Sequence, residues 1–278
     1  MKELYINNSQ REASYLLMRN RFFPVLRPLA SLLVASGVSA AIQFLPRRFL
    51  PREVSELVAA AIFLRLYVAG ARWIERRRAV ELSPDRSALG ILEGLVFGIV
   101  LFSCVMGILR LAGVYSPGAW GRWQPLGLAL LSALEGAVFE ETVFRGFLFR
   151  SLARFGDNWI ALGVTATLFS LAHVGKPGAT WVSGLAGFAA GILFGAAFAS
   201  RSSLWLPIGI HAGWNFAEGP VFGMEVSGNA RPVGWIGGQL HGPAILTGGA
   251  FGPEASIAAV VVCSVLAAFY LRKMRRAD

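Results

Sequence analysis

The chain has 278 residues, of which 55% are hydrophobic and 15% are charged. Soluble domains carry about 25% charged residues, so this composition excludes an ordinary soluble domain and favours a protein that crosses a membrane several times. A net charge of +10 would indicate nucleic-acid binding in a soluble protein. Here the basic residues cluster beside apolar segments, which predicts contact with anionic lipid head groups and no nucleic-acid partner.

Eight apolar stretches follow one another along the chain and predict transmembrane helices. A basic segment (1–24) precedes the first stretch, which we expect to be a retained anchor and not a cleaved signal peptide. The predicted spans are 28–45, 54–74, 88–113, 125–150, 158–175, 179–200, 203–218 and 255–272. The sequence therefore predicts an all-α fold, a polytopic transmembrane bundle of about eight helices with short loops.

We expect one structural domain. Residues 1–85 would form its N-terminal basic segment with the first two spans, and residues 86–278 would form its core. The segment 219–253 is rich in Gly and Pro, and it is too polar to span a membrane. It is therefore predicted to be a long loop of the kind that often carries function.

The distribution of Arg and Lys predicts the orientation of the spans. An even number of spans places both termini on one side, and a cytoplasmic placement puts most basic residues inside. The segments predicted to lie inside are 1–24, 71–86, Arg150 with Arg154, Arg201 and 272–276. The cluster of Arg47, Arg48 and Arg52 falls outside, against this assignment. The prediction is a multi-pass protein of the plasma or inner membrane with cytoplasmic termini.

Small residues in the apolar stretches indicate close helix packing. Ser183, Gly187, Gly191 and Gly195 recur every four positions and would line one helix stripe, which lets a neighbouring backbone approach. The cysteines, Cys104 and Cys263, both lie in apolar stretches, which predicts small buried side chains and no disulfide framework.

The stretch EGAVFEETVFRGF (135–147) places charged residues inside a predicted span. Charges at membrane depth cost at least about 2.5–3.5 kcal/mol each and usually face a cavity or each other. Glu141 and Arg145 are four residues apart, so they meet on one helix face as an ion pair. Glu140 lies about 100° around the helix from Glu141 and needs a partner from another helix, which suits a general base. Glu135 is predicted to make a separate polar contact.

Two of the three histidines also lie in predicted spans. His173 ends one of them, with Phe169 one turn before it, and His211 lies in another, with Asn215 one turn after it. Residues four apart share a helix face, so His211 and Asn215 can point into one cavity. The third histidine, His241, is predicted to be a surface residue.

Any one of these polar residues alone is more typical of a hydrogen bond between helices than of catalysis. Five of them occur on three predicted spans, and a water-filled site within the membrane explains the whole set: Glu140, Glu141, Arg145, His173 and His211. The sequence has no nucleophile elbow around a serine, no HExxH zinc signature and no paired aspartates on separate spans. A carboxylate, two imidazoles and an amide suit water activation and oxyanion stabilisation, as in amide hydrolysis.

Three motifs in this region resemble those of a known family. EETVFR reads as EExxxR, FSLAH as FxxxH and HAGWN as HxxxN. In this order they resemble the CAAX proteases and bacteriocin-processing enzymes, the CPBP or Abi family, which includes the type II CAAX prenyl endopeptidases. The resemblance covers roughly 90–272, and LTGGAFGPEAS (246–256) is similar to the loop before that family's last helix.

The resemblance implies an intramembrane endopeptidase that cleaves peptide or prenylated-peptide substrates without a cofactor. Glu140 would deprotonate water with help from His173, and His211 with Asn215 would hold the oxyanion. Glu141 and Arg145 would form a supporting ion pair, and Phe169 would pack beside the site.

Two alternatives stay open at this point. Two histidines and a glutamate also form a plausible zinc triad with an open water position, so the same protease could use zinc bound by Glu140, His173 and His211. The chain could instead be a non-catalytic membrane factor, such as a bacteriocin self-immunity protein or a scaffold, because intramembrane polar residues also mark other functions. The sequence decides neither the oligomeric state nor whether the substrate is prenylated.

Overall fold

A computed structural model describes residues 52–124, 126–154, 156–229 and 234–275, together with the single positions Leu33 and Gly37. The predicted span 28–45 lies outside these residues, apart from those two positions, and so do Arg47, Arg48 and Arg231. The described chain is mostly helical, with one two-stranded sheet, and the predicted all-α helix bundle is confirmed.

The helices follow the predicted apolar stretches closely. In chain order they are α2 (Arg52–Trp73), α3 (Ser87–Leu111), α4 (Leu126–Glu141), the π-helix η3 (Thr142–Phe149), α5 (Arg150–Ala153), α6 (Asn158–Leu171), α7 (Trp181–Arg201), α8 (Trp205–Phe216), the π-helix η4 (Ala217–Val221), α9 (Ala244–Thr247) and α10 (Ile257–Met274). The described residues also form four short 3₁₀ turns: η1 (Val80–Leu82), η2 (Pro84–Arg86), η5 (Gly249–Phe251) and η6 (Pro253–Ala255).

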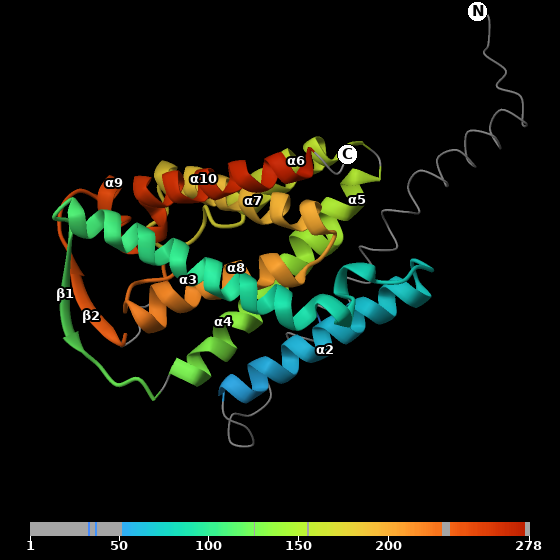
Figure 1. The fold of residues 1–278 in the computed structure, drawn as a ribbon, viewed down its shortest axis with the longest axis horizontal. Coiled ribbons are helices and arrows are strands. Elements are labelled where there is room, and N and C mark those ends of the chain that lie inside the picture. Colours follow the sequence, from blue (N-terminus) through green and yellow to red (C-terminus); the bar gives the residue numbers. More distant parts are fainter. Residues whose placement is uncertain are drawn as a thin grey trace, which may run out of the picture.

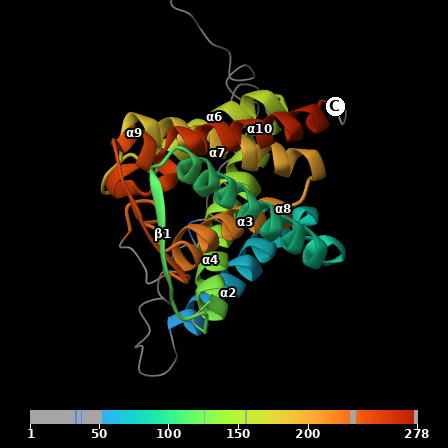
Figure 2. The ribbon, with the colours of Figure 1, turned by 60° about the vertical axis from the view of Figure 1, so that its left-hand side comes forward.

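The helices stack in layers, as Figure 1 shows and the rotated view in Figure 2 supports. Helices α6, α7 and α10 lie together on one side, α3 and α8 cross the middle, and α2 and α4 lie on the other side. Within the described chain, four helices are long and apolar enough to cross a membrane: 54–73, 87–111, 181–201 and 257–274. They coincide with four of the predicted spans, and the protein is a membrane protein.

Two predicted spans differ in detail from the observed helices. The span predicted over 158–175 ends as a helix at Leu171, and the following residues form turns. The span predicted over 125–150 is not one regular helix, because it changes to a π-helix after Glu141. π-Helical turns inside α-helices are found frequently at functional sites.

Side-chain caps fix where several helices begin. The Asp157 carboxylate accepts a hydrogen bond from the Ile160 N–H (2.8 Å) at the start of α6, and the Ser256 hydroxyl accepts one from Ala259 (3.2 Å) at the start of α10. Thr180 and Ser183 form a capping box at the start of α7. These side chains satisfy N–H groups that lack partners within a helix's first turn.

Small residues bring α7 against α6, as the four-residue stripe predicts. A Cβ added at Gly191 would lie 2.7 Å from the Ala166 Cα, and one at Gly195 would lie 2.5 Å from the Leu162 Cδ1. The glycine stripe of α7 therefore packs closely against α6.

A second glycine contact, between α3 and α8, is not part of the sequence prediction. Gly94 faces Gly209 and Gly98 faces Gly213 on α8, which carries His211, and Gly90 lies against Trp205 and Leu206 at the start of the same helix. A Cβ at Gly94 would lie 2.4 Å from the Leu206 carbonyl oxygen and 2.7 Å from the Gly209 Cα. These neighbours are backbone atoms, so they cannot move aside as a flexible side chain can.

Replacing Gly94 with Ala is expected to destabilise the fold by about 1–3 kcal/mol, because the added methyl overlaps the α8 backbone. The matched control is Gly107→Ala on the same helix, where an added Cβ meets no heavy atom within 4 Å. Equilibrium unfolding in mixed detergent micelles measures both variants. Equal stability of the two would contradict the proposed close contact.

The Gly-rich segment 219–253 is more regular than the predicted long loop. Strand β2 (Ile236–Leu240) pairs antiparallel with β1 (Tyr115–Trp120), with Tyr115 opposite Leu240. Helix α9 follows it. Glycine-rich strands lack the alternation of polar and apolar side chains that reveals a strand in a sequence. Gly238 is required here because a Cβ would lie 2.4 Å from the Tyr115 ring.

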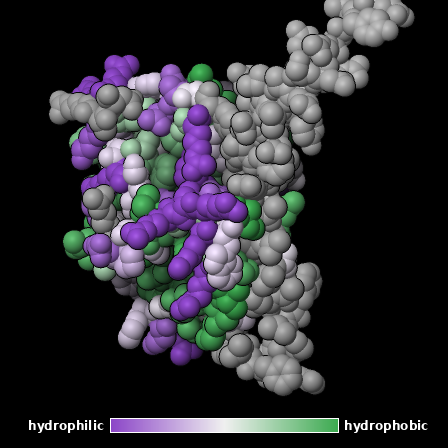
Figure 3. Space-filling model, turned by 90° about the vertical axis from the view of Figure 1, so that its right-hand side faces the viewer, coloured by the Kyte–Doolittle hydropathy of each residue, from purple (hydrophilic) through white to green (hydrophobic). Residues whose placement is uncertain are grey.

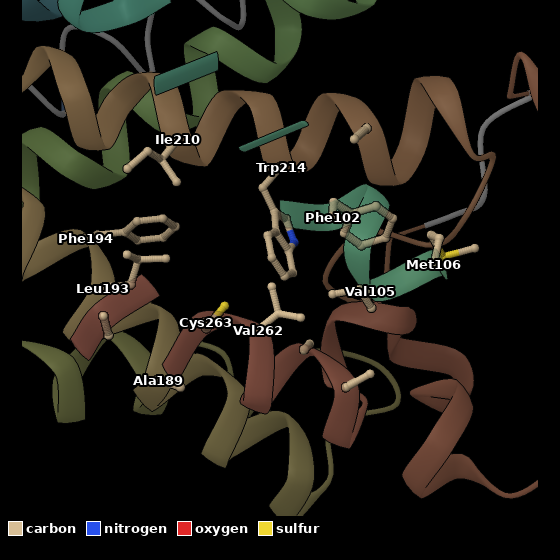
Figure 4. Close-up of a cluster of buried hydrophobic side chains, with 14 of the residues drawn as sticks. Phe102, Val105, Met106, Ala189, Leu193, Phe194, Ile210, Trp214, Val262 and Cys263 are labelled. Carbon is tan, nitrogen blue, oxygen red and sulfur yellow. The ribbon is translucent and has the colours of Figure 1, made fainter. Parts of the chain in front are cut away.

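The core beside the site is formed by side chains of α3, α7, α8 and α10. Figure 4 shows Phe102, Leu193, Phe194, Trp214 and Val262 converging between these helices. Cys263 is buried among them, as predicted, whereas Cys104 is exposed on α3, so the prediction of a buried side chain is wrong there. A residue in an apolar stretch of a membrane helix can face lipid as well as the core, and the sequence alone does not separate the two.

The basic segments predicted to be inside lie at one end of the bundle. The connection between α2 and α3, helix α5, the end of α7 and the end of α10 all reach the right-hand end in Figure 1. Figure 3 views this end and shows a band of hydrophilic side chains across it. The shared location agrees with a single membrane face for these segments.

Candidate active site

Glu140 lies in the last turn of α4, directly before the π-helix η3. Its side chain is 28% exposed, so the carboxylate is partly open to the surroundings. The Oε2 atom itself is buried and has no hydrogen-bond partner among the described residues. The structure thus leaves this carboxylate without a fixed local partner.

His173 reaches Glu140 from the turn after α6. Its Nδ1 donates a hydrogen bond to the Phe169 carbonyl oxygen (2.8 Å), and since a carbonyl can only accept, Nδ1 carries the hydrogen. In the neutral ring the Nε2 atom is then an acceptor, and it lies 3.9 Å from the Glu140 Oε2. The FxxxH spacing therefore fixes the tautomer of the histidine through a backbone contact.

His211 reaches Glu140 from α8 and is oriented by Glu141. The His211 Nδ1 lies 2.9 Å from the Glu141 Oε1, and its Nε2 lies 4.0 Å from the Glu140 Oε2. A carboxylate accepts, so the Nδ1 of His211 also carries the hydrogen. The two adjacent glutamates therefore act differently, because one orients His211 and the other faces its opposite nitrogen.

Arg145 neutralises Glu141 in a fully buried ion pair. Its Nη1 donates to the Glu141 Oε1 (2.9 Å), and its Nη2 donates to the Gly191 carbonyl oxygen (3.0 Å) on α7. Both side chains have no solvent exposure. The sequence predicts the ion pair, but not the second contact of Glu141, to His211 from α8, because that contact depends on where α8 lies in the bundle.

Aromatic rings enclose the ion pair and both imidazoles. The Arg145 guanidinium lies 4.8 Å from the centre of the Phe169 ring and 5.2 Å from that of Phe194. Phe194 also stacks on the His211 ring, with 5.0 Å between ring centres and 11° between planes. Sequence reasoning selects Phe169 but misses Phe194, because one Phe in an apolar span carries no distinguishing pattern.

The site opens into one cavity. His173, His211 and Asn215 line it together with Phe169 and Phe194, and Ser227 and Glu254 line it as well. The structure therefore places the Asn215 amide and the imidazoles of His173 and His211 on the wall of one cavity. Glu140, Glu141 and Arg145 are not among the residues that line this cavity, and neither is Glu135. His241 is exposed after β2.

When both imidazoles are neutral, three acceptors surround one gap: the Glu140 carboxylate and the Nε2 atoms of the two histidines. The distances of 3.9 Å and 4.0 Å are too long for direct hydrogen bonds. Three acceptors cannot satisfy one another, so the gap calls for a donor, and a water molecule can donate to two of them. Chemically, the arrangement can bind a water molecule beside a carboxylate base.

The donor set also has the composition of a zinc site, but the distances do not fit one. Tetrahedral ligands with zinc bonds of about 2.0–2.1 Å lie roughly 3.3–3.4 Å from each other. The separations from Glu140 to both histidines are longer. No group of three His, Cys, Asp or Glu residues in the described ranges could hold a metal ion.

Comparison with protein families covers the part of the chain that carries these motifs. Residues 122–217 match the type II CAAX prenyl endopeptidase family, Rce1-like. The predicted resemblance is confirmed over this segment. No curated protein and no solved structure matches the chain.

The Rce1-like segment runs from the start of α4 to the end of α8, so it contains all three motifs. The apolar helices indicate a multi-pass membrane protein, and its segment 122–217 is similar to the CAAX-type proteases. A protease of this type acts on a peptide in a membrane setting. Helices α2, α3 and α10 lie outside the Rce1-like segment, although α3 packs against α8 within it.

Proposed function

We propose that the protein is an intramembrane endopeptidase that hydrolyses a peptide bond with a water molecule activated by Glu140. One observation carries the proposal: the Glu140 Oε2 faces the Nε2 atoms of His173 and His211 at 3.9 Å and 4.0 Å, and both histidines line a cavity together with Asn215. The Rce1-like match supports hydrolysis over other uses of intramembrane polar residues.

The chemical steps balance with these residues alone. Glu140 takes a proton from water, and the hydroxide oxygen attacks the carbonyl carbon of the substrate. His173 accepts a hydrogen bond from the water through Nε2 and so orients it. The protonated Glu140 then gives its proton to the leaving amine as the carbon–nitrogen bond breaks.

The oxyanion requires donors. Asn215 can donate through its amide, and His211 donates through Nε2 when both of its nitrogens are protonated. The Glu141 carboxylate at Nδ1 stabilises that charged ring. Arg145 fixes the carboxylate in turn, so the pair supports the site without contacting the substrate.

The substrate we propose is a peptide that carries a prenyl group. The cavity is lined mainly by apolar side chains, among them Phe169, Phe194, Trp214 and Phe251, which suits an apolar substrate group. The matched family is also named for CAAX prenyl substrates, which are peptides that carry a prenyl group at a C-terminal CAAX sequence. We further propose that the basic end of the bundle faces the cytoplasm of the plasma or inner membrane, with both termini on that side.

The test is cleavage of a farnesylated peptide with a C-terminal CAAX sequence by the purified full chain in lipid vesicles. Mass spectrometry of the products would show the bond that is cut. A parallel comparison of membrane peptides in cells that carry wild-type protein or Glu140→Gln would reveal natural substrates as peptides that persist uncut. If the wild type and Glu140→Gln cleave equally in both assays, water activation by Glu140 is excluded.

Removal of metal ions is expected to leave the proposed activity unchanged, because the described ligand distances are too long for zinc. The measurement compares cleavage rates before and after dialysis against a strong chelator, together with the zinc content of the purified protein. A loss of activity that added zinc restores, with about one zinc per chain, would favour the zinc alternative over the proposed one.

A further inference from the structure

A buried polar cluster lies at the hydrophilic end of the bundle, outside the Rce1-like segment. Its members are Tyr67 near the end of α2 and three residues of the connection to α3: Glu75, Arg77 and Glu81. We call these four residues the brace. Glu81 is 2% exposed and Tyr67 is 5% exposed.

The charges of the brace are balanced by close ion pairs. The Arg77 Nε lies 2.7 Å from a Glu75 oxygen, and the Arg77 Nη2 lies 2.8 Å from a Glu81 oxygen. Glu75 also contacts Arg150 of α5 (2.6 Å). Burial alone would raise the pKa of Glu75, but the hydrogen bond from Arg77 and the charge of Arg150 outweigh it and lower that pKa. The Glu75 carboxylate is therefore ionised, and through Arg150 it joins the brace to α5, which follows η3.

The brace reaches the π-helix η3 through one backbone atom. The Tyr67 hydroxyl lies 2.7 Å from the carbonyl oxygen of Gly146, the residue after Arg145, and Arg150 donates to the same oxygen (2.9 Å). A Cβ at Gly146 would lie 3.1 Å from the Tyr67 oxygen, so a glycine allows this approach. Glu81 also lies within hydrogen-bond distance of the Tyr67 hydroxyl.

The same connection holds the start of α8. The Leu204 N–H donates to the Glu81 carbonyl oxygen (2.9 Å), and the Trp205 indole donates to the Ser83 carbonyl oxygen (2.9 Å). Helix α8 carries His211, and η3 continues from the turn that carries Glu140. Tyr67 contacts η3 and the connection after α2 contacts α8, and these are the two elements whose relative position sets the gap between Glu140 and His211.

We propose that Tyr67 and Glu81 are positioning residues, which hold the π-helix in register with α8 and so set the distances within the candidate site. The proposal rests on the proposed function, because it concerns the rate of the same reaction. It adds residues before 122, outside the family match, to the machinery of the protein. Small displacements of reacting groups, on the order of 1 Å, lower rates about 100-fold.

Tyr67→Phe tests the proposal because it removes only the hydroxyl and keeps the packed ring. We expect kcat for the farnesylated peptide to fall about 10- to 100-fold, with KM changed less than about twofold. Amide hydrogen exchange in residues 142–150 is expected to become faster. The matched control is Glu93→Gln, which breaks another ion pair, to Arg201, without touching η3. It should change neither kcat nor exchange.

Thermal unfolding of both variants in detergent checks that they fold. A Tyr67→Phe protein with wild-type kcat and wild-type exchange in 142–150 would overturn the positioning role. Glu140→Gln is measured alongside. If it is inactive while Tyr67→Phe is fully active, only the brace proposal fails. If Glu140→Gln is as active as wild type, the proposed function fails, and the exchange measurement still decides whether the brace holds the π-helix.

Discussion

Replacing Glu140 with Gln is expected to lower the rate of peptide cleavage by at least about 100-fold and up to about 10,000-fold, the range that a positioned general base contributes. The amide has nearly the same shape as the carboxylate, but it cannot take a proton from water. Glu140 has no hydrogen-bond partner at Oε2 among the described residues, so the substitution breaks no hydrogen bond of that atom within this part of the chain. Initial rates with the farnesylated peptide, at saturating and at low concentration, measure the loss.

Glu135→Gln is the matched control for this prediction, because it makes the same chemical change on the same helix, five residues before Glu140. Its rate should stay within about twofold of wild type, since a change of that size is only about 0.4 kcal/mol in barrier height. His211→Ala should be as damaged as Glu140→Gln. If both site variants keep wild-type function in cells, a non-catalytic membrane factor becomes the better interpretation.

Replacing Arg145 with Met is expected to destabilise the protein by about 3–5 kcal/mol, because it leaves the Glu141 carboxylate buried without its cation. Glu141 and Arg145 both have no exposure, so water cannot replace the lost contact. Met keeps much of the side-chain length and fills the space between Phe169 and Phe194. Equilibrium unfolding in mixed detergent micelles gives the free-energy difference.

The double variant Glu141→Gln with Arg145→Met separates charge from packing. Gln carries no charge and its carbonyl oxygen can still accept from the His211 Nδ1, so most of the lost stability should return. A double-mutant cycle built with Glu141→Gln alone gives the coupling energy of the pair. The prediction is contradicted if the free energy of unfolding of Arg145→Met is within about 1 kcal/mol of the wild-type value, because such a loss is typical of an exposed ion pair.

The segment that matches the family does not form a separate unit of the structure. The Rce1-like segment ends with α8, yet α8 is held by the glycines of α3 on one side and by the connection after α2 at its start. Residues without any family signal thus determine where His211 lies. Stability and activity should therefore both respond to changes at Gly94 and Tyr67.

Features that depend on residues close together in the chain follow from the sequence alone. Runs of apolar residues predict the helices because a membrane requires length and apolarity over a continuous stretch. The pairing of Glu141 with Arg145 follows from helix geometry at a spacing of four. The small-residue stripe on α7 follows from the same periodicity.

The contacts between residues of different helices are set by the tertiary structure. It placed Glu140 between His173 and His211, brought Glu141 to His211 as well as to Arg145, and stacked Phe194 on the His211 ring. It also introduced the π-helix after Glu141 and directed Tyr67 to the Gly146 carbonyl. Such contacts depend on how whole helices pack, and several involve backbone atoms, which are the same in every residue and leave no trace in the sequence.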